Sequence, residues 1–263
     1  MSPDDTYTHG HAESVLRSHR WRTAENSAPH LLPVLRPGLD LLDVGCGPGT
    51  ITADLAARVA PGRVVGTDRS PAVVAAAAAD HPGVTFVVGD VYGLDHADAS
   101  FDVVHAHQVL QHLSDPVAAL REMRRVCRPD GVVAVRDSDY AAFTWDPPSS
   151  ELDRWLAVYR AVARRNDADP DAGRRLKGWA LAAGFGSVSV SCSVWTFSTA
   201  DERAWWGGLW ADRVTTTTLA DQAVAAGLAT REELASIADA FARWAADDTA
   251  VFVVPSVEVL ARP

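Results

Sequence analysis

Short apolar runs alternate with helical patterns through the first half of this chain. Five such runs predict buried strands, at residues 39–44, 63–67, 84–88, 101–105 and 131–137. The segments between them carry helix-start signals, because Ser70-Pro71 and Asp115-Pro116 each place a capping side chain before a proline at the first helical position. Strands that alternate with helices favour a parallel sheet covered on both faces. The pattern predicts an α/β fold.

The second half is less regular. Apolar positions at helical spacing predict helices over 151–166 and 171–183, and the second ends at Gly184. A sixth strand is expected at 187–194. A seventh is expected at 256–262, after Pro255, because proline has no N–H to donate to a central strand pairing.

About residues 198–249 separate these last two strands, and they predict a helical cap inserted into a domain that spans 39–263. Thr199 with Glu202, and Thr230 with Glu233, have the spacing of capping boxes at helix starts. The insertion is rich in tryptophan: Trp205, Trp206, Trp210 and Trp244. These rings either fill the core of the insertion or line a substrate pocket. Trp206 is a candidate substrate contact, as is Trp145, which lies in the loop before the helix predicted at 151–166.

Residues 1–38 precede the first strand and have an aromatic and basic character. We expect a helical lid here, with Tyr7 and His11 as candidate contacts to the substrate, since lids commonly exclude water from such sites. The alternative is an amphipathic helix that packs on the edge of the sheet.

The stretch LLDVGCGPGT, residues 41–50, predicts a ligand-binding turn between the first strand and a helix. Gly45, Gly47 and Gly49 leave the backbone open to close approach, and a helix N-terminus favours an anionic group. The dinucleotide fingerprint needs a glycine three residues after its second, and this chain has Thr50 there. Asp68 ends the second strand at the distance expected of a carboxylate that accepts ribose hydroxyls.

The ordered segments LLDVGCGPGT, VVGTDRS, FVVGDV, FDVVHAHQVLQHLSDP and LREMRRVCRPDGVVAV resemble the motifs of class I S-adenosylmethionine-dependent methyltransferases. The nearest likeness is to the broad group that includes ubiquinone- and menaquinone-biosynthesis enzymes and natural-product methyltransferases. The resemblance covers about residues 31–140. It implies S-adenosylmethionine as cofactor and a Rossmann-like, mostly parallel sheet of seven strands, with helices on both faces and the last strand antiparallel.

The resemblance also implies a cofactor contact at the end of each early strand. It places the methionine part of the cofactor at the glycine turn, with Asp43, Gly45 and Gly47 around it. Asp68, at the end of the second strand, would contact the ribose, and Arg69, Asp90 and Val91 would contact the adenine. The backbone carbonyl of His107, after the fourth strand, would hold the amino group of the cofactor.

Catalysis is harder to predict from the sequence. Methyl transfer mainly requires alignment of the nucleophile with the methyl group, and a general base is needed only if the nucleophile must first lose a proton. His107, His112 and Asp139 are the candidate bases. The alternatives are a structural histidine, for His112, inside a helix that begins near Gln108, and a turn cap for Asp139. A metal site is not expected, because His107-Gln108 follows the fourth strand where metal-dependent relatives have an aspartate.

The formal net charge of −10 and the absence of a basic tail disfavour a nucleic-acid substrate. Three widely spaced cysteines, no signal peptide and no long apolar run indicate a cytoplasmic protein without a membrane span, and the arginine and alanine content suggests a bacterial source. We expect a monomer or homodimer that methylates a small apolar or aromatic molecule. The alternatives are a cofactor-binding regulatory protein without turnover, an NAD(P)-dependent oxidoreductase, and a methyltransferase acting on protein or nucleic acid.

Overall fold

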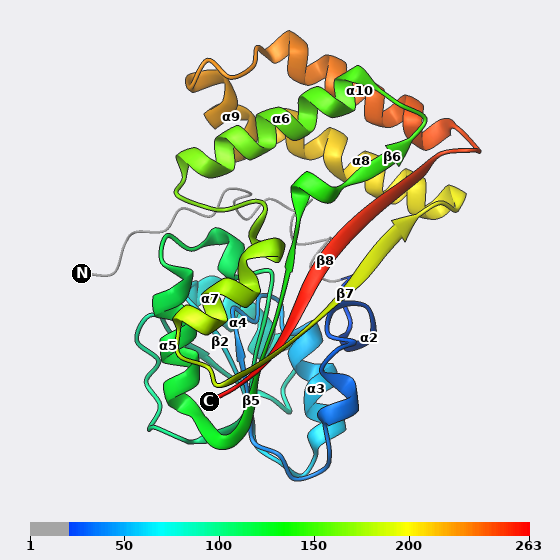
Figure 1. The fold of residues 1–263 in the computed structure, drawn as a ribbon. Helices are drawn as coiled ribbons and strands as arrows, with labels where there is room; N and C mark the ends of the chain where they lie inside the picture. Colours follow the sequence, from blue (N-terminus) through cyan, green and yellow to red (C-terminus); the bar gives the residue numbers. More distant parts are fainter. Residues whose placement is uncertain (1–20) are drawn as a thin grey trace.

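The computed structural model describes residues 21–263 and contains one sheet of eight strands, in the order β3-β2-β1-β4-β5-β8-β6, with β7 paired to β8 (Figure 1). Strands β1 to β5 pair in parallel, and β8 runs antiparallel to its neighbours. The strands are β1 (Leu41–Val44), β2 (Val64–Asp68), β3 (Thr85–Val88), β4 (Phe101–His107), β5 (Cys127–Ser138), β6 (Thr144–Asp146), β7 (Ser187–Phe197) and β8 (Val251–Arg262). The predicted fold class is confirmed, and the short strand β6 is an addition to the seven strands expected.

Helices cover both faces of the parallel part of the sheet. On one face α2 (Ala24–Ser27) and α3 (Thr50–Val59) share a core with the sheet, while α5 (Pro116–Val126) and α7 (Leu176–Ala182) share another core on the opposite face. Helix α4 (Pro71–Asp80) joins β2 to β3. The predicted caps are confirmed, because Ser70 accepts from the N–H of Val73 and Asp115 accepts from the N–H of Ala118.

Four helices form a cap above the carboxyl ends of the parallel strands (Figure 1). They are α6 (Ser150–Arg165), α8 (Ala200–Thr216), α9 (Thr218–Ala225) and α10 (Arg231–Ala246). Both predicted capping boxes are present, at the starts of α8 and α10. The cap extends beyond the insertion at 198–249, because α6 and the upper halves of β7 and β8 belong to the same hydrophobic core.

Strands β7 and β8 are long and run from among the lower helices up to the side of the cap (Figure 1). The expectation that the last strand begins after Pro255 is wrong, because β8 begins at Val251. Pro255 is tolerated because its position falls between two pairings: β5 pairs as far as Ser256, and β6 pairs only from Val253. On that side no ladder partner requires an N–H from residue 255.

Two predicted helices differ in detail. The expected helix at 171–183 is a 3-10 turn, Ala172–Arg175, followed by α7. The expected helix from Gln108 is also wrong, because residues Leu110–His112 form a 3-10 turn and the α-helix begins only at Pro116. The backbone N–H of Gln111 bonds to the Asp137 carboxylate, which holds the turn to β5 instead of letting a helix begin.

The N-terminal segment meets the lower core. Ala24, Ala28 and Leu31 are buried against α3, and the 3-10 turn Leu32–Val34 leads to β1. The described part of the predicted lid therefore packs on a face of the sheet. Tyr7 and His11 lie outside the described residues.

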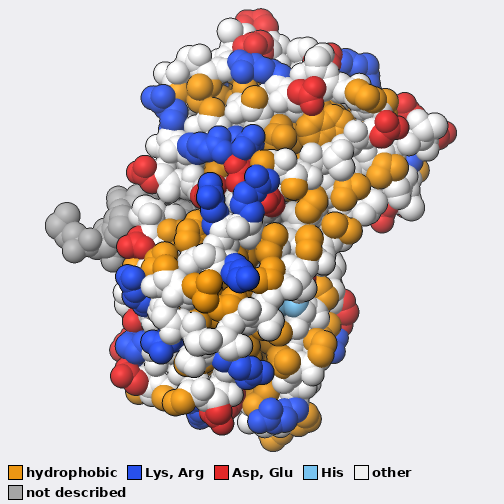
Figure 2. All heavy atoms as spheres, viewed as in Figure 1, with side chains coloured by type: hydrophobic (Ala, Val, Ile, Leu, Met, Phe, Trp, Pro, Cys, Tyr) orange, Lys and Arg blue, Asp and Glu red, His pale blue; other side chains and the backbone are white. Residues whose placement is uncertain are grey.

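Basic side chains gather where the cap meets the lower lobe (Figure 2). Arg160 and Arg164 of α6 both bond to Asp171, and Arg174 bonds to Asp139. These arginines therefore form ion pairs at the junction of the cap and the lower lobe. Among residues 21–263, no helix is both long enough and apolar enough to cross a bilayer.

Candidate cofactor and acceptor site

The glycine turn between β1 and α3 has the backbone that its sequence predicts. Gly45, Gly47 and Gly49 have φ values of +67°, +54° and +81°, which side chains rarely allow. The N–H groups of Gly45 and Cys46 donate to the carbonyl of Thr67, at 2.8 and 3.0 Å. A Cβ atom on Gly45 would lie 2.4 Å from Val109 Cγ2. The turn therefore requires glycine, both for its backbone conformation and for the close approach of Val109.

Asp68 connects this turn to the end of β2. Its Oδ2 accepts from the N–H of Gly47 at 3.1 Å, and its Oδ1 accepts from the N–H of Ser70 at 3.0 Å. A carboxylate has about four acceptor positions, so two remain for a diol. Asp68 is half-buried at the carboxyl end of its strand, which suits contact with the ribose of a nucleotide.

Asp43 is buried below the turn, and both of its oxygens have protein partners. Oδ1 lies 2.7 Å from His105 Nδ1, and Oδ2 accepts from the Thr52 hydroxyl at 2.6 Å. The carboxylate thus joins β1, β4 and α3 and supports the glycine turn from beneath.

The predicted adenine residues follow β2 and β3 at the same sheet edge. Arg69 is exposed directly after Asp68, and Asp90 is exposed after β3. The Asp90 Oδ1 accepts from the N–H of Tyr92 at 3.0 Å, which turns the chain at the half-buried Val91. Because β1, β2 and β3 are neighbouring parallel strands, these residues share the edge with the glycine turn.

His107 ends β4, and its buried ring lies 5.8 Å from the ring of Trp195. The next residue, Gln108, has φ +52°, a conformation that is uncommon outside glycine and concentrates at functional sites. Its Nε2 donates to Ser138 Oγ at 2.6 Å, and its Oε1 accepts from Arg22 at 2.5 Å. Gln108 therefore ties the N-terminal segment to the ends of β4 and β5.

The other two candidate bases have partners that compete with proton transfer. Both oxygens of Asp139 accept from Arg174, at 2.6 and 2.7 Å. His112 Nε2 lies 3.0 Å from Gln111 Nε2, and burial, together with the positive charge of Arg22, lowers the pKa of His112 to about 3. His112 is therefore neutral at physiological pH.

Asp137 is a carboxyl group that the sequence analysis passed over as a candidate base. It is fully buried, and burial raises its pKa to about 8, against the hydrogen bond from the N–H of Gln111 at 3.2 Å. The Asp137 carboxyl group is therefore protonated at neutral pH. An aspartate inside the apolar strand GVVAVRDS was the available signal.

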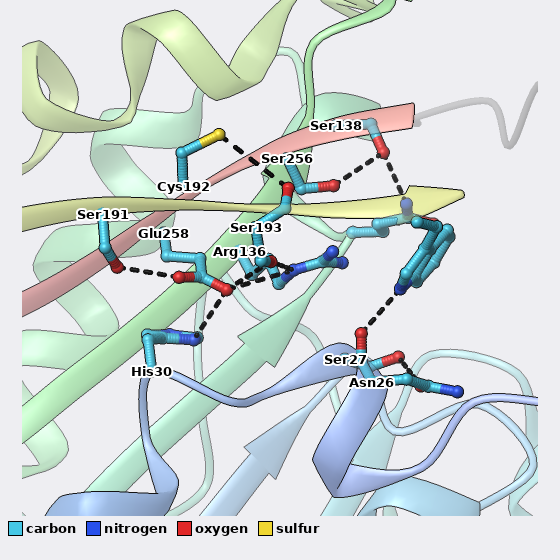
Figure 3. Close-up of polar contacts among 12 residues, drawn as sticks. Asn26, Ser27, His30, Arg136, Ser138, Ser191, Cys192, Ser193, Ser256 and Glu258 are labelled. Atoms are coloured by element: carbon cyan, nitrogen blue, oxygen red, sulfur yellow. Dashed lines mark hydrogen bonds and ion pairs between the residues drawn. The ribbon is translucent and has the colours of Figure 1, made fainter. Parts of the chain in front are cut away.

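A second polar group lies on the opposite face of β5 (Figure 3). Arg136 and Glu258 are buried neighbours on β5 and β8, with Arg136 Nε 3.5 Å from the Glu258 carboxylate. Ser193 of β7 accepts from Arg136 Nε at 3.0 Å. An arginine within a run of valine and alanine was again the sequence signal, and it was missed.

The two tryptophans predicted to contact substrate belong to the cap core. Trp206 is buried and stacks on Phe197 with ring centres 4.3 Å apart, and Trp145 stacks on Phe252 at 5.3 Å. Among residues 21–263, no group of three or more His, Cys, Asp and Glu side chains is arranged to hold a metal ion.

Comparisons with known proteins agree with this geometry. Residues 42–135 match the family model described as a methyltransferase domain. An uncharacterized methyltransferase of Schizosaccharomyces pombe, C1B3.06c, is 32% identical over 97% of this chain and 95% of its own length. The probable methyltransferase ltbC of Aspergillus luteorubrus is 34% identical, covering 76% of this chain and 77% of that protein.

Solved structures share the fold. A putative methyltransferase of Bacillus halodurans C-125 superimposes with a TM-score of 0.58 at 20% identity, covering 89% of this chain and 97% of that one. The phosphoethanolamine N-methyltransferase 2 of Haemonchus contortus, solved with S-adenosylhomocysteine, has a TM-score of 0.53 at 18% identity, covering 87% of this chain and 50% of that one.

A Rossmann-like sheet with a glycine turn after its first strand, and an aspartate at the end of the second, is typical of nucleotide-cofactor enzymes. The chain belongs to the S-adenosylmethionine-dependent methyltransferases, and S-adenosylmethionine is its cofactor.

Proposed function

We propose that this methyltransferase acts on a small molecule with an apolar or aromatic part, and that the acceptor binds between the carboxyl ends of β4 and β5 and the cap. The observation that carries the proposal is the position of the cap over the cofactor edge (Figure 1). A long polymer would need an open surface there, and the net charge of −10 disfavours nucleic acid.

The aromatic side chains beside Gln108 support an apolar acceptor. Trp21 lies 5.2 Å from Trp195 and 5.2 Å from Trp205, measured between ring centres. Trp21 is 37% exposed to solvent, so this group of rings is only partly packed into the protein core. Such rings bind flat apolar surfaces at small entropic cost.

Within the site, each residue has a distinct proposed part. Gly45 and Gly47 present their backbone to the methionine end of the cofactor, and Asp68 accepts from the ribose. Asp90 and the N–H of Val91 take the adenine, with Arg69 beside it. The bound cofactor supplies a methyl group on a positively charged sulfur. The protein supplies alignment and exclusion of water, and a base only for an acceptor that must first lose a proton.

The test is calorimetric titration with S-adenosylmethionine, S-adenosylhomocysteine and NADH, for the wild type and for Asp68→Ala. We expect the two sulfur nucleotides to bind and NADH not to bind. Asp68→Ala should weaken binding by about 1–3 kcal/mol, because charge-assisted hydrogen bonds to the ribose are lost. Turnover is then measured as the formation of S-adenosylhomocysteine from S-adenosylmethionine in the presence of small aromatic and quinone-like acceptors.

Asp239→Ala is the matched control, since Asp239 is an exposed aspartate of α10 in the cap. Unchanged cofactor affinity in a folded Asp68→Ala variant would contradict the ribose assignment. Binding without turnover on any acceptor would favour a regulatory protein.

A further inference from the structure

Arg136 is a buried cation with an unused hydrogen-bonding edge. Its side chain is fully buried, yet Nη1 and Nη2 have no hydrogen-bond partner among the described residues, 21–263. Within that part of the chain the guanidinium donates a hydrogen bond through Nε, to Ser193 Oγ at 3.0 Å. Each buried donor left unpaired costs about 1–3 kcal/mol, and more when the group is charged. A fold that keeps such a group gains from whatever pairs with it.

The partner of Arg136 does not use this edge. Glu258 lies 3.5 Å from Nε, and its two oxygens accept from the hydroxyls of Ser191 at 2.7 Å and Ser193 at 2.5 Å (Figure 3). Burial lowers the pKa of His30, which lies 3.7 Å from the same carboxylate, to about 3, so His30 is neutral. His30 therefore adds no positive charge to this cluster, and Arg136 is its one cationic side chain.

The unused edge is at the reacting end of the sheet. Arg136 is in register with His107, and its carbonyl accepts from the N–H of Gln108 at 2.7 Å. The ring of Trp195 covers one face of the guanidinium, with Cζ 4.8 Å from the ring centre. The face is thus occupied by an aromatic ring, and the two terminal nitrogens remain for a planar anion.

We propose that the acceptor is a carboxylic acid and that Arg136 binds its carboxylate through Nη1 and Nη2. The proposal rests on the proposed function and narrows its substrate class to an acid with an apolar body. Two parallel N–H donors match a carboxylate, whereas a lysine ammonium would offer only a point charge.

The N-terminal segment contacts this cluster at several points, which would hold a bound acid away from water. Trp195 Nε1 donates to the carbonyl of Asn26 at 2.6 Å, and His30 approaches Glu258. A charged pair shielded from water is stronger than one on the surface.

The experiment is calorimetric titration of the protein saturated with S-adenosylhomocysteine. The probes are benzoate and hexanoate, each compared with its methyl ester. We expect at least one acid to bind about tenfold more tightly than its ester, from the charge-assisted pair. Arg136→Lys keeps the positive charge beside Glu258 but loses the planar edge, and should remove most of that preference. Arg203→Lys is the matched control, because Arg203 is also buried and hydrogen-bonded, at the base of the cap.

Equal binding of acids and esters, an unchanged preference in Arg136→Lys, or binding of none of the acids would each overturn the proposal. The double variant Arg136→Met/Glu258→Gln removes both charges together, so it tests the site without leaving Glu258 unpaired. If the wild type does not bind S-adenosylhomocysteine at all, the proposed cofactor site is contradicted instead. Failure of the carboxylate proposal and failure of the proposed function are therefore distinguishable.

Discussion

The cofactor edge and the cap are held together by different physics. At the edge, glycine φ values and backbone N–H groups shape the site, and Asp68 completes it with two hydrogen bonds. In the cap, large rings fill the space between helices, with Trp155 and Trp210 packed 4.5 Å apart and fully buried. The shape of the cofactor edge depends on residues that can adopt positive φ values. The stability of the cap depends on the volume of its buried side chains.

This difference predicts which substitutions should change stability and which should change cofactor binding. Removing volume from the cap should lower stability and leave the glycine turn intact. Adding a single methyl group to the turn should damage cofactor binding with a smaller effect on the core.

Trp210→Ala should have the largest effect on stability. The side chain is fully buried among Trp155, Trp206 and Phe241, so its loss should cost about 3–5 kcal/mol of unfolding free energy. Urea unfolding measures the change. Trp205→Ala is the matched control, because Trp205 is only partly buried, and it should cost less. Equal losses in both variants would show that the cap core is not organised around Trp210.

Gly45→Ala should separate the two regions in the opposite sense. Its positive φ and the close approach of Val109 predict about 1–3 kcal/mol of strain, together with loss of S-adenosylhomocysteine affinity. Calorimetry and urea unfolding together measure both effects. Gly178→Ala is the control, because a Cβ there meets no atom within 4 Å and should stabilise α7 slightly. Full cofactor affinity in Gly45→Ala would contradict the role of the turn.

Asp137→Asn should give the smallest effect, visible only as a change in pH dependence. The folded state holds a proton on Asp137 up to a pKa of about 8, whereas the unfolded chain releases it near pH 4. The stabilising contribution is therefore complete at low pH and is lost as the pH rises toward 8.

Between pH 6.5 and 8, the wild type should lose on the order of 1 kcal/mol relative to Asp137→Asn. The buried histidines His30 and His112 also titrate between the folded and unfolded states, but both proteins contain them, so their contribution cancels from the difference. Urea unfolding at the two pH values, with exposed Asp239→Asn as reference, measures the difference. Parallel pH profiles for wild type and Asp137→Asn would exclude a protonated Asp137.

Sequence reasoning succeeded where the chemistry is local. The glycine turn, the caps at Ser70 and Asp115, and the capping boxes of α8 and α10 were predicted because each depends on residues a few positions apart. The parallel strands followed from their apolar runs, although β5 extends from Cys127 to Ser138, well beyond the stretch predicted.

It failed where the answer depends on distant partners. The position of Pro255 is acceptable only because β5 and β6 both stop short of it, and neither limit is written near residue 255. Arg136 and Glu258 are 122 positions apart in the sequence, and nothing local to either pairs them. The charge states of Asp137 and His112 likewise follow from burial, which a single sequence does not display.

The continuous pairing of β7 with β8 has a consequence for how an acceptor reaches the site. The register runs unbroken from Ser187 opposite Arg262 to Phe197 opposite Phe252. Val259 and Ala261 of β8 belong to the lower core, and Phe252 and Val254 belong to the cap core. A hinge between the two lobes would have to bend or break this ladder, so we expect the lobes to move little relative to one another. We therefore expect an acceptor to enter beside the N-terminal segment, where hydrogen bonds at Trp195 and Gln108 join residues 22 and 26 to the rest of the protein.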